Sequence, residues 1–385
     1  MGYREARVKW NGFEGTVSIN NPVLRYPGNP ILTSHEVNKV WAHEARLHCY
    51  TVHNAGMAKV VDSDGQEQTI MLFRSHIADG RSVIGKAVSE NGINAWRVDP
   101  QPFLLPATEK DIFAEGVDIK SMIEWEAGGV EDIRVNPVGN GSYILTYSAY
   151  QNQLPDRVKV MMAVTQDFHK VIRYGPMFQA DMRNVVIFPE PDGNGRWRAL
   201  LRPNDKEQEA TGSGHIGGSF TQIVAGFASS PTGPWETGDV IMSSGHGPSA
   251  FQAKIGPGAP PVKTRFGWLN VFHGVRSTMA GHPYSLGVAF HDLQDPTDPR
   301  KIRLSAKPIL MPSLSDCLVK ESDYIHVPNV VFSCGVLKGQ EDTLAIYYGG
   351  HDTVMNLGLA NIRILHEICN LFPMDPLSGQ HLYSL

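Results

Sequence analysis

The 385-residue sequence has only four cysteines and no long apolar run. The cysteines are scattered, without the short spacings of a metal site: Cys49, Cys317, Cys334 and Cys369. We interpret them as reduced thiols of a cytosolic protein, because disulfides are rare in that compartment. No segment approaches the roughly 20 apolar residues of a membrane helix. Charged residues at positions 4, 5 and 7 argue against a secretory signal. We therefore expect a cytoplasmic protein without a membrane partner.

Neither sign of charge is in large excess, since 34 basic and 39 acidic residues give a formal net charge of −5. This balance argues against a nucleic-acid partner. Familiar catalytic motifs are missing too. His43 and His48 lie five residues apart, whereas a zinc-protease helix needs four. Residues 212–217 carry the letters of a dinucleotide fingerprint, but between strand-like runs rather than in a β-α-β unit. No Gly-x-Ser-x-Gly nucleophile elbow occurs.

What is present is a three-part pattern that recurs five times. Each unit opens with a short apolar segment that holds polar residues, continues with a strand-like run and closes with a third apolar run. The openings lie at 52–56, 130–134, 183–188, 253–257 and 327–332. The middle runs lie at 70–74, 143–147, 198–202, 268–273 and 344–348, and the closing runs at 83–88, 158–164, 223–227, 286–290 and 357–362. Five similar all-β units predict a five-bladed β-propeller with one unit per blade.

The propeller uses the whole chain, 1–385, as a single catalytic domain. Its blades are expected at about 49–105, 127–178, 182–242, 250–310 and 326–372. The segment 1–48 precedes them and is expected to close the ring by pairing with the last blade. Within it, 29–32 is predicted to be an edge element and 36–47 a short helix. Residues 111–115 are predicted to form a helical turn, and 205–219 a polar Gly-rich loop.

The innermost strands of a propeller converge near its axis, so the polar residues of the openings should meet in one pocket. The openings and the middle runs together supply four potential cations: Arg183, Arg202, Lys254 and His273. Cations grouped in this way are costly to bury unless an anion neutralises them. Two arginine forks and a lysine suit phosphate. The alternative is a set of ordinary salt bridges at the blade ends. Further polar groups come from Asn54, Arg74, Asn184, Tyr284, Asn329 and Asp352.

The adjacent carboxylates Glu131 and Asp132 supply a candidate general acid. Neighbouring residues of a strand point to opposite faces, so only one of the two should face the pocket. The alternative is a buried carboxylate bound to backbone or to Arg134. Aromatic residues near the pocket could stack on sugars or simply pack in the core: Tyr147, Tyr150, Trp268, Phe272 and Tyr284.

One acid beside a basic cluster favours phosphorolysis of a glycosidic bond over hydrolysis. A glycosidase needs a second carboxylate to activate water or to attack the sugar. Phosphate is already anionic and needs no base.

The residues named above resemble those of a known protein family. From about Asn29 to Ile362 the chain resembles glycoside hydrolase family 130, the inverting β-mannoside phosphorylases. The matching segments are Gly129–Arg134, Arg183–Asn184 with Phe188–Glu190, Leu201–Pro203, Lys254–Gly256 with Gly258 and Pro260–Pro261, Gly267–Leu269 through His273–Val275, Asp292–Leu293 with Asp295–Pro296, Val327–Phe332, and Tyr347–Gly349 with Asp352–Thr353.

The resemblance implies a five-bladed propeller in which Asp132 is the general acid, acting through the 3-hydroxyl of the mannosyl unit. It places Arg183, Arg202, Lys254, His273 and Tyr284 on phosphate, to which we add Asn184. It places Asn54, Arg74 and Asp352 on the sugar in subsite −1, to which we add Glu131. The products would be α-mannose 1-phosphate and a shortened acceptor, with phosphate as co-substrate, no metal or organic cofactor, and a possible homo-oligomer. The alternatives are an inverting β-mannosidase of the same fold and an inactive carbohydrate-binding propeller.

Four departures from the family pattern stand out. Three are interpreted as structural: Ile133, Phe290–His291 and Gly256–Ala259. The fourth, Cys317–Tyr324, replaces a region that normally contains Tyr-Glu. Together with the insertion Pro106–Glu126 it points to an altered acceptor subsite. The linkage (β-1,4 or β-1,2) and the acceptor (glucose, N-acetylglucosamine or mannose) stay open.

Overall fold

The computed structural model describes residues 4–41, 43–62, 64–151, 154–204, 221–244, 249–279, 281–317 and 324–382. The predicted loop 205–219 and the fingerprint-like residues 212–217 lie outside them. Strands dominate, as predicted for an all-β chain. The described helices are short: α1 (Ser34–Trp41), α2 (Ile119–Glu126) and α4 (Ile362–Leu371), with 3-10 turns η1 (Ala45–Leu47), η2 (Pro299–Lys301) and η3 (Leu314–Cys317). None of these helices is long and apolar enough to cross a membrane. All four cysteines are free thiols, as predicted.

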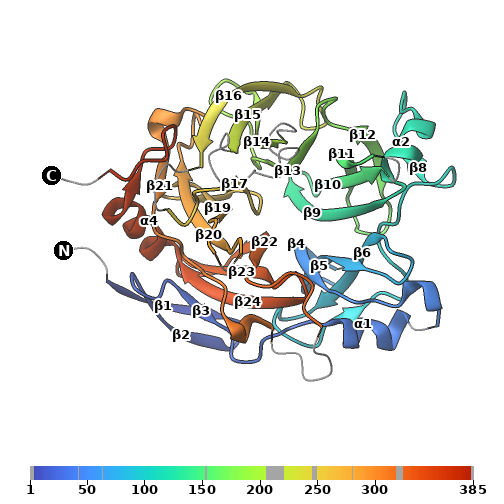
Figure 1. The fold of residues 1–385 in the computed structure, drawn as a ribbon, viewed down its shortest axis with the longest axis horizontal. Helices are drawn as coiled ribbons and strands as arrows, with labels where there is room; N and C mark the ends of the chain where they lie inside the picture. Colours follow the sequence, from blue (N-terminus) through green and yellow to red (C-terminus); the bar gives the residue numbers. More distant parts are fainter. Residues whose placement is uncertain are drawn as a thin grey trace.

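The strands fall into five groups that follow one another along the chain and lie around a common centre (Figure 1). Group one has β4 (His53–Val61), β5 (Glu67–His76), β6 (Ser82–Ser89) and β7 (Arg97–Val98). Group two has β9 (Gly129–Pro137), β10 (Tyr143–Gln151), β11 (Leu154–Thr165), β12 (Ile172–Pro176) and β8 (Ile112–Phe113). Group three has β13 (Met182–Ile187), β14 (Trp197–Pro203), β15 (Gln222–Ala228) and β16 (Glu236–Ser243).

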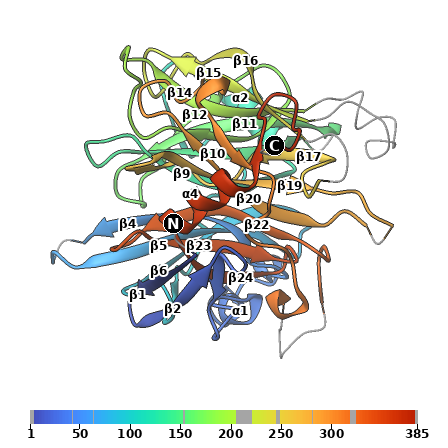
Figure 2. The same ribbon diagram turned by 90° about the vertical axis from the view of Figure 1, so that its left-hand side faces the viewer.

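The last two groups take in strands from the chain ends. Group four has β17 (Lys254–Pro257), β18 (Val262–Thr264), β19 (Gly267–Val275), β20 (Tyr284–His291), β21 (Arg303–Ser305) and β25 (Pro373–Met374). Group five has β22 (Val331–Lys338), β23 (Thr343–Gly350), β24 (Val354–Asn361) and the N-terminal β3 (Val23–Arg25). A separate hairpin has β1 (Glu5–Trp10) and β2 (Phe13–Ser18). Figure 2 shows the same five groups of strands from the side, after a turn of 90°.

Among the described residues, named strands of different groups pair at only one place. A single parallel pair, Ser82 with Gly129, links β6 to β9, so groups one and two count as one nine-stranded sheet. The predicted middle runs lie on strands, and so do the closing runs apart from Ile362, which begins α4. The fifth opening, predicted at 327–332, becomes a strand only at Val331.

Apolar packing joins every group to its neighbours. Strands β19, β23 and β24 are buried along their whole length, which requires both faces of their sheets to be covered. Four apolar clusters accordingly mix residues of two successive groups. Examples are Leu72 with Leu145, Ile144 with Leu201, Leu200 with Phe272, and Leu269 with Ile346. A fifth cluster joins the last group to the first, with Tyr347 beside Phe73 and Met57.

Three local predictions are corrected by the structure. Residues 111–115 form no helical turn, because Ile112 and Phe113 pair as a parallel strand with β12. The helix of this insertion begins after Asp118, whose side chain accepts a hydrogen bond from the Ser121 N–H. The helix expected at 36–47 is α1 followed by the separate turn η1. The edge strand is β3 rather than 29–32, where Leu32 makes a single bridge to Met355.

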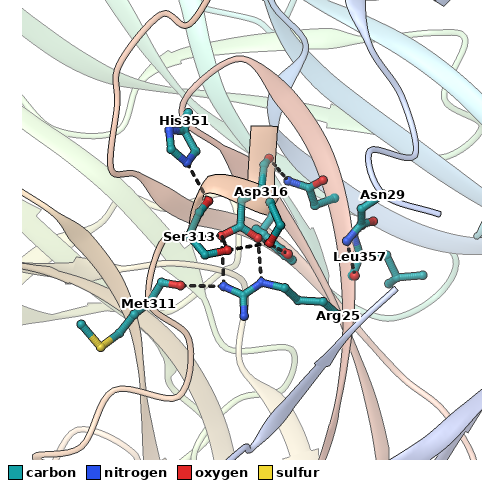
Figure 3. Close-up of polar contacts among 10 residues, drawn as sticks. Arg25, Asn29, Met311, Ser313, Asp316, His351 and Leu357 are labelled. Atoms are coloured by element: carbon teal, nitrogen blue, oxygen red, sulfur yellow. Dashed lines mark hydrogen bonds and ion pairs between the residues drawn. The ribbon is translucent and has the colours of Figure 1, made fainter. Parts of the chain in front are cut away.

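Asp316 ties the N-terminal segment to group five, where β3 pairs with β24 (Figure 3). The Arg25 Nε donates to Asp316 Oδ1 at 2.7 Å and its Nη2 donates to Oδ2 at 3.0 Å. Tyr348 Oη donates to Oδ1 at 2.9 Å and the Ser313 N–H donates to Oδ2 at 2.7 Å. The Asp316 side chain is 1% exposed. Burial raises its pKa, but the contacts with Arg25 outweigh this and hold the pKa below the ordinary 3.8.

Replacing Arg25 by Met should lower the free energy of unfolding by about 1–3 kcal/mol, because a buried carboxylate loses its cation. A lowered pKa means that this contribution is present above pH 3.8 and is lost as the pH falls through the folded-state value. The thermal midpoints of parent and variant should therefore converge in acid. Arg97→Met is the control, since its pair with Glu90 is long and exposed. Equal losses in the two variants would contradict this role of Arg25.

Candidate functional site

Three polar residues of the opening strands occupy the same unusual backbone position. Asn54, Asp132 and Asn184 have φ values of 50°, 50° and 53°. Asn and Asp enter this left-handed region more readily than other side chains. Each of the three begins a β-bulge, in which two residues of the first strand face one residue of the second. Bulges re-aim side chains and are common beside active sites.

The bulge at Asp132 changes the predicted arrangement of the carboxylate pair. The expectation that only one carboxylate faces the site is wrong, because both bind the same guanidinium. Arg74 Nη2 donates to Glu131 Oε1 at 2.6 Å, and Arg74 Nη1 donates to Asp132 Oδ1 at 3.2 Å. The left-handed residue interrupts the alternation of the strand, so adjacent side chains point the same way. Ser82 Oγ also donates to Glu131 Oε1 at 2.8 Å, and Asn54 Nδ2 donates to Asp132 Oδ1 at 3.0 Å.

Two carboxyl groups of this region, Asp132 and Asp352, have different proton affinities. Burial raises the pKa of Asp132, but the guanidinium groups of Arg74 and Arg134 outweigh it, so the pKa lies below the ordinary value. Asp352 shows the opposite balance. Burial and the nearby carboxylates of Asp132 and Glu131 raise its pKa to about 7, although Arg74 acts against them. Up to about pH 7 a proton is thus held on Asp352 in preference to Asp132.

Arg134 is a central residue whose importance the sequence did not reveal. Its side chain is fully buried. The Nη1 group donates to the carbonyl of Asp132 at 2.6 Å, Nη2 to Asn184 Oδ1 at 2.9 Å and Nε to the carbonyl of Gly258 at 3.0 Å. It therefore binds the backbone of Asp132 rather than its carboxylate. Its partners belong to group two, to group three and to the segment just after β17. The one available signal was a charged residue two positions after the predicted acid.

The basic residues lie on facing strands of groups three and four. Arg183 of β13 is directly opposite Arg202 of β14. Lys254 of β17 is opposite Val275 of β19, which is in turn opposite Tyr284 of β20. The rings of His273 and Tyr284 are stacked, with centroids 6.1 Å apart.

Gly256 brings the two basic groups together. A Cβ built on this glycine would lie 2.6 Å from the His273 ring and 2.9 Å from Arg202 Cδ. Both side chains therefore occupy the space that the missing Cβ leaves. His273 is buried, and its Nδ1 has no hydrogen-bond partner among the described residues. Burial and the cations Arg202, Arg134 and Lys254 hold its pKa well below 6.5, so its ring is neutral.

Tyrosines connect the basic residues with the carboxylates. The Arg183 guanidinium lies 5.3 Å from the centre of the Tyr150 ring. Burial raises the pKa of Tyr150 to about 12, with Arg183 lowering it and Glu131 raising it. Burial likewise raises the pKa of Tyr284, which responds to Arg202, Asp352, Arg183 and Asp132. The carboxylates and the cations thus form one electrostatic site.

Two buried oxygens in this site have no hydrogen-bond partner among the described residues: Asn54 Oδ1 and Asp352 Oδ1. Buried acceptors of this kind are costly unless a ligand donates to them. Sugar hydroxyls are suitable donors. No group of three or more His, Cys, Asp or Glu residues in the described parts of the chain could hold a metal ion.

Some predicted residues have other roles. Tyr147 is buried in the core and donates to Glu126 at 2.7 Å, and Trp268 and Phe272 are core residues. The carbonyl of Asn329 accepts from the Tyr284 N–H at 3.0 Å, while its own N–H donates to His351 Nδ1 at 3.3 Å. These contacts give Asn329 a structural part in placing Tyr284.

Known proteins resemble the chain over most of its length. A family model described as beta-1,4-mannooligosaccharide phosphorylase matches residues 236–372. A β-1,2-mannobiose phosphorylase of a Thermoanaerobacter species is 30% identical over 287 residues, which cover 73% of this chain and 77% of that protein. The β-1,2-mannobiose phosphorylase of Listeria innocua is 28% identical, covering 93% and 92%. The 4-O-β-D-mannosyl-D-glucose phosphorylase of Bacteroides fragilis is 28% identical, covering 94% and 88%.

Solved structures share the fold. The structure of β-1,2-mannobiose phosphorylase from Listeria innocua, in complex with β-1,2-mannobiose, has a TM-score of 0.69 at 22% identity, covering 91% of this chain and 99% of that chain. A structure from work on GH130 glycoside hydrolases that target β-1,2 mannosidic linkages in Candida mannan has a TM-score of 0.65 at 18% identity, covering 89% and 94%.

The raised pKa of Asp352 predicts a pH-dependent change in stability. A carboxyl that keeps its proton up to about pH 7 stabilises the fold fully below its ordinary pKa of 3.8, and this contribution is lost as the pH rises through 7. Asp352→Asn does not titrate and suits a φ of 48°. Relative to the parent, it should gain stability between pH 5 and pH 8, by at most about 3 kcal/mol. Thermal unfolding at both pH values measures this, with the exposed Asp64→Asn as control. A constant difference across the range would contradict the assignment.

Proposed function

The chain belongs to glycoside hydrolase family 130, and on that premise we propose that it cleaves a β-mannoside with inorganic phosphate. The reaction inverts the anomeric centre and gives α-D-mannose 1-phosphate and a shortened acceptor sugar. One observation carries the proposal: the carboxylate of Asp132, held by Asn54 and Arg74, shares its site with the cations of groups three and four. A phosphate dianion fits such a site, because Arg and Lys side chains bind phosphate oxygens and phosphate is itself the nucleophile.

We also propose that the five groups are the blades of one five-bladed propeller that forms a single catalytic domain. The support is the set of five apolar clusters, each between successive groups and one between the last group and the first. The labels of β4, β9, β13, β17 and β22 lie nearest the middle of Figure 1. Loops and opening strands of different blades would then contribute to one central pocket.

Phosphate would lie between groups three and four. Arg183 and Arg202 would bind its oxygens from one side, and Lys254, His273 and Tyr284 from the other. Asn184 uses its Oδ1 to accept from Arg134, which leaves its Nδ2 to donate to phosphate. The mannosyl unit would lie beside Asn54, Arg74, Glu131 and Asp352, where its hydroxyls satisfy the two buried acceptor oxygens.

The proposed step exchanges one bond at the anomeric carbon for another. A phosphate oxygen attacks from the face opposite the leaving oxygen, and the glycosidic bond breaks. Asp132 supplies the proton that the leaving oxygen gains, through the 3-hydroxyl of the mannosyl unit, and the phosphate proton restores it. Binding of the phosphate dianion and exclusion of water both raise the pKa of Asp132 from its low value in the empty site. The raised pKa of Asp352 reduces the negative charge that this residue adds beside Asp132.

We propose a cytoplasmic enzyme that needs no metal or organic cofactor. The four free thiols support the compartment. The use of phosphate supports the absence of a metal or cofactor requirement, because phosphate is already a nucleophile and needs no Lewis acid to activate it. The possible homo-oligomer remains a prediction from the sequence.

The main alternative to this function is that of an inverting β-mannosidase of the same fold, which hydrolyses the bond. The other alternative is that of an inactive carbohydrate-binding protein. The protein should be incubated with α-D-mannose 1-phosphate and a panel of sugars: mannose, glucose, N-acetylglucosamine and β-linked mannobioses. Release of phosphate with formation of a β-mannoside supports the phosphorylase and identifies acceptor and linkage. Cleavage that is equally fast without phosphate would support the hydrolase, and no turnover in either direction would support the inactive protein.

Asp132→Asn should reduce turnover by about 10²- to 10⁴-fold, because the amide cannot donate the proton. Asn tolerates the left-handed backbone at this position, so the fold and the thermal midpoint should be kept. Turnover is measured as phosphate released from α-D-mannose 1-phosphate. Near-normal turnover in this variant would make Glu131 the next candidate for the acid.

Lys254→Ala and His273→Ala should each raise the KM for phosphate by about 10- to 100-fold, because each loses a contact to a charged ligand. The KM for the mannoside should change much less. Lys263→Ala is a matched control, because Lys263 is an exposed residue of group four that pairs with Glu190. An equal rise in both KM values would show that these residues do not bind phosphate selectively.

A further inference from the structure

A row of six rings runs from the carboxylate site to the protein surface. In order, they are His53, His76, His326, Tyr324, Tyr50 and His48. Successive ring centroids are 5.6, 4.4, 6.1, 6.4 and 5.1 Å apart. The row is assembled from segments distant in sequence: the ends of β4 and β5, the approach to β4, and the approach to β22.

The inner end of the row contacts Arg74, and Arg74 binds the proposed catalytic carboxylate of Asp132. His76 Nε2 lies 3.0 Å from Arg74 Nη2, and the same guanidinium binds Asp132 and Glu131. His53 is fully buried and precedes Asn54 in the chain. The outer end is open, since Tyr50 is 47% exposed and Tyr324 is 45% exposed.

The three histidines are not arranged as a metal site. The rings of His53 and His76 lie parallel, with an interplanar angle of 8°, so they present faces rather than nitrogen lone pairs to each other. Among the described residues no metal-binding group of three or more ligands is found. Burial and the charge of Arg74 lower the pKa of His76 to about 3 and also lower that of His326. The rings are therefore neutral near pH 7 and offer flat faces and hydrogen-bonding nitrogens.

We propose that this row binds the acceptor part of the substrate, with Tyr50 and Tyr324 stacking on the sugar beyond the one joined to the mannosyl unit. The occupant is thus an oligosaccharide chain that leaves the site along the rings. Exposed aromatic faces are unfavourable in water and suit the apolar faces of sugar rings. Tyr324 Oη lies 2.8 Å from His326 Nδ1, which fixes the ring at the mouth. This inference rests on the proposed function, because it takes the site of Asp132 as the place where the bond is cleaved.

One ring of the row, Tyr324, is the last residue of the departure noted at Cys317–Tyr324. His326 lies two positions later, and its N–H donates to Thr353 Oγ1 at 2.9 Å, next to Asp352. The approach to β22 is thereby anchored beside the carboxyl group that is proposed to bind the sugar.

The test compares acceptors of different length in the synthetic direction. With α-D-mannose 1-phosphate as donor, Tyr324→Ala and Tyr50→Ala should raise the KM for β-linked mannotriose by about 3- to 10-fold, the range of one lost ring contact. The KM for single-sugar acceptors and for α-D-mannose 1-phosphate should stay unchanged. Tyr324→Phe keeps the ring but loses its contact with His326, and should lie between the parent and Tyr324→Ala. Tyr174→Ala, at a tyrosine of β12 that is 36% exposed, should have no effect.

A second measurement separates this inference from the proposed function. Mannotetraoses of both linkages are titrated into the parent, Tyr324→Ala and Tyr174→Ala by calorimetry, which needs no turnover. Weaker binding only in Tyr324→Ala supports the row even if no phosphorolysis is found. Equal binding in all three proteins, or equal losses for short and long acceptors, would overturn it.

Discussion

Arg134 is the constraint on which the candidate site depends. A buried guanidinium must have every donor satisfied, and here the partners are the Asp132 carbonyl, the Asn184 side chain and the Gly258 carbonyl. The guanidinium of Arg134 thus fixes three parts of the site relative to one another: the backbone of Asp132, the side chain of Asn184 and the turn after β17. Arg134 also holds the backbone of Asp132 without occupying its carboxylate, which stays available to Asn54, Arg74 and substrate.

The same type of β-bulge recurs in the first strands of groups one, two and three. Asn54, Asp132 and Asn184 each lie where two residues face one, and each has a left-handed backbone. An ordinary strand would send every second side chain into the apolar clusters on its faces. The bulge lets polar side chains leave the strand end toward the centre while the rest of the strand stays packed between neighbouring sheets.

The sequence predicted the strands well, because apolar runs of strand length recurred at similar spacing and the packing of both faces kept them apolar. It also predicted the members of the carboxylate and basic sets, since polar residues inside such runs are conspicuous. It could not predict that Glu131 and Asp132 share Arg74, which depends on the φ of one residue. Nor could it predict the proton on Asp352 or the row of rings, because both arise from segments up to about 300 positions apart that only tertiary structure brings together.

The pairing of β3 with β24 has a consequence for how the protein is made. Residues 23–25 leave the ribosome early, whereas their partners at 358–360 follow only after nearly all other strands. Arg25 likewise waits for Asp316. Group five therefore cannot be completed during most of synthesis, and neither can the apolar cluster it shares with group one. Nascent chains must keep an apolar strand edge unpaired for that time, which exposes them to aggregation and favours protection by chaperones until the last sheet is built.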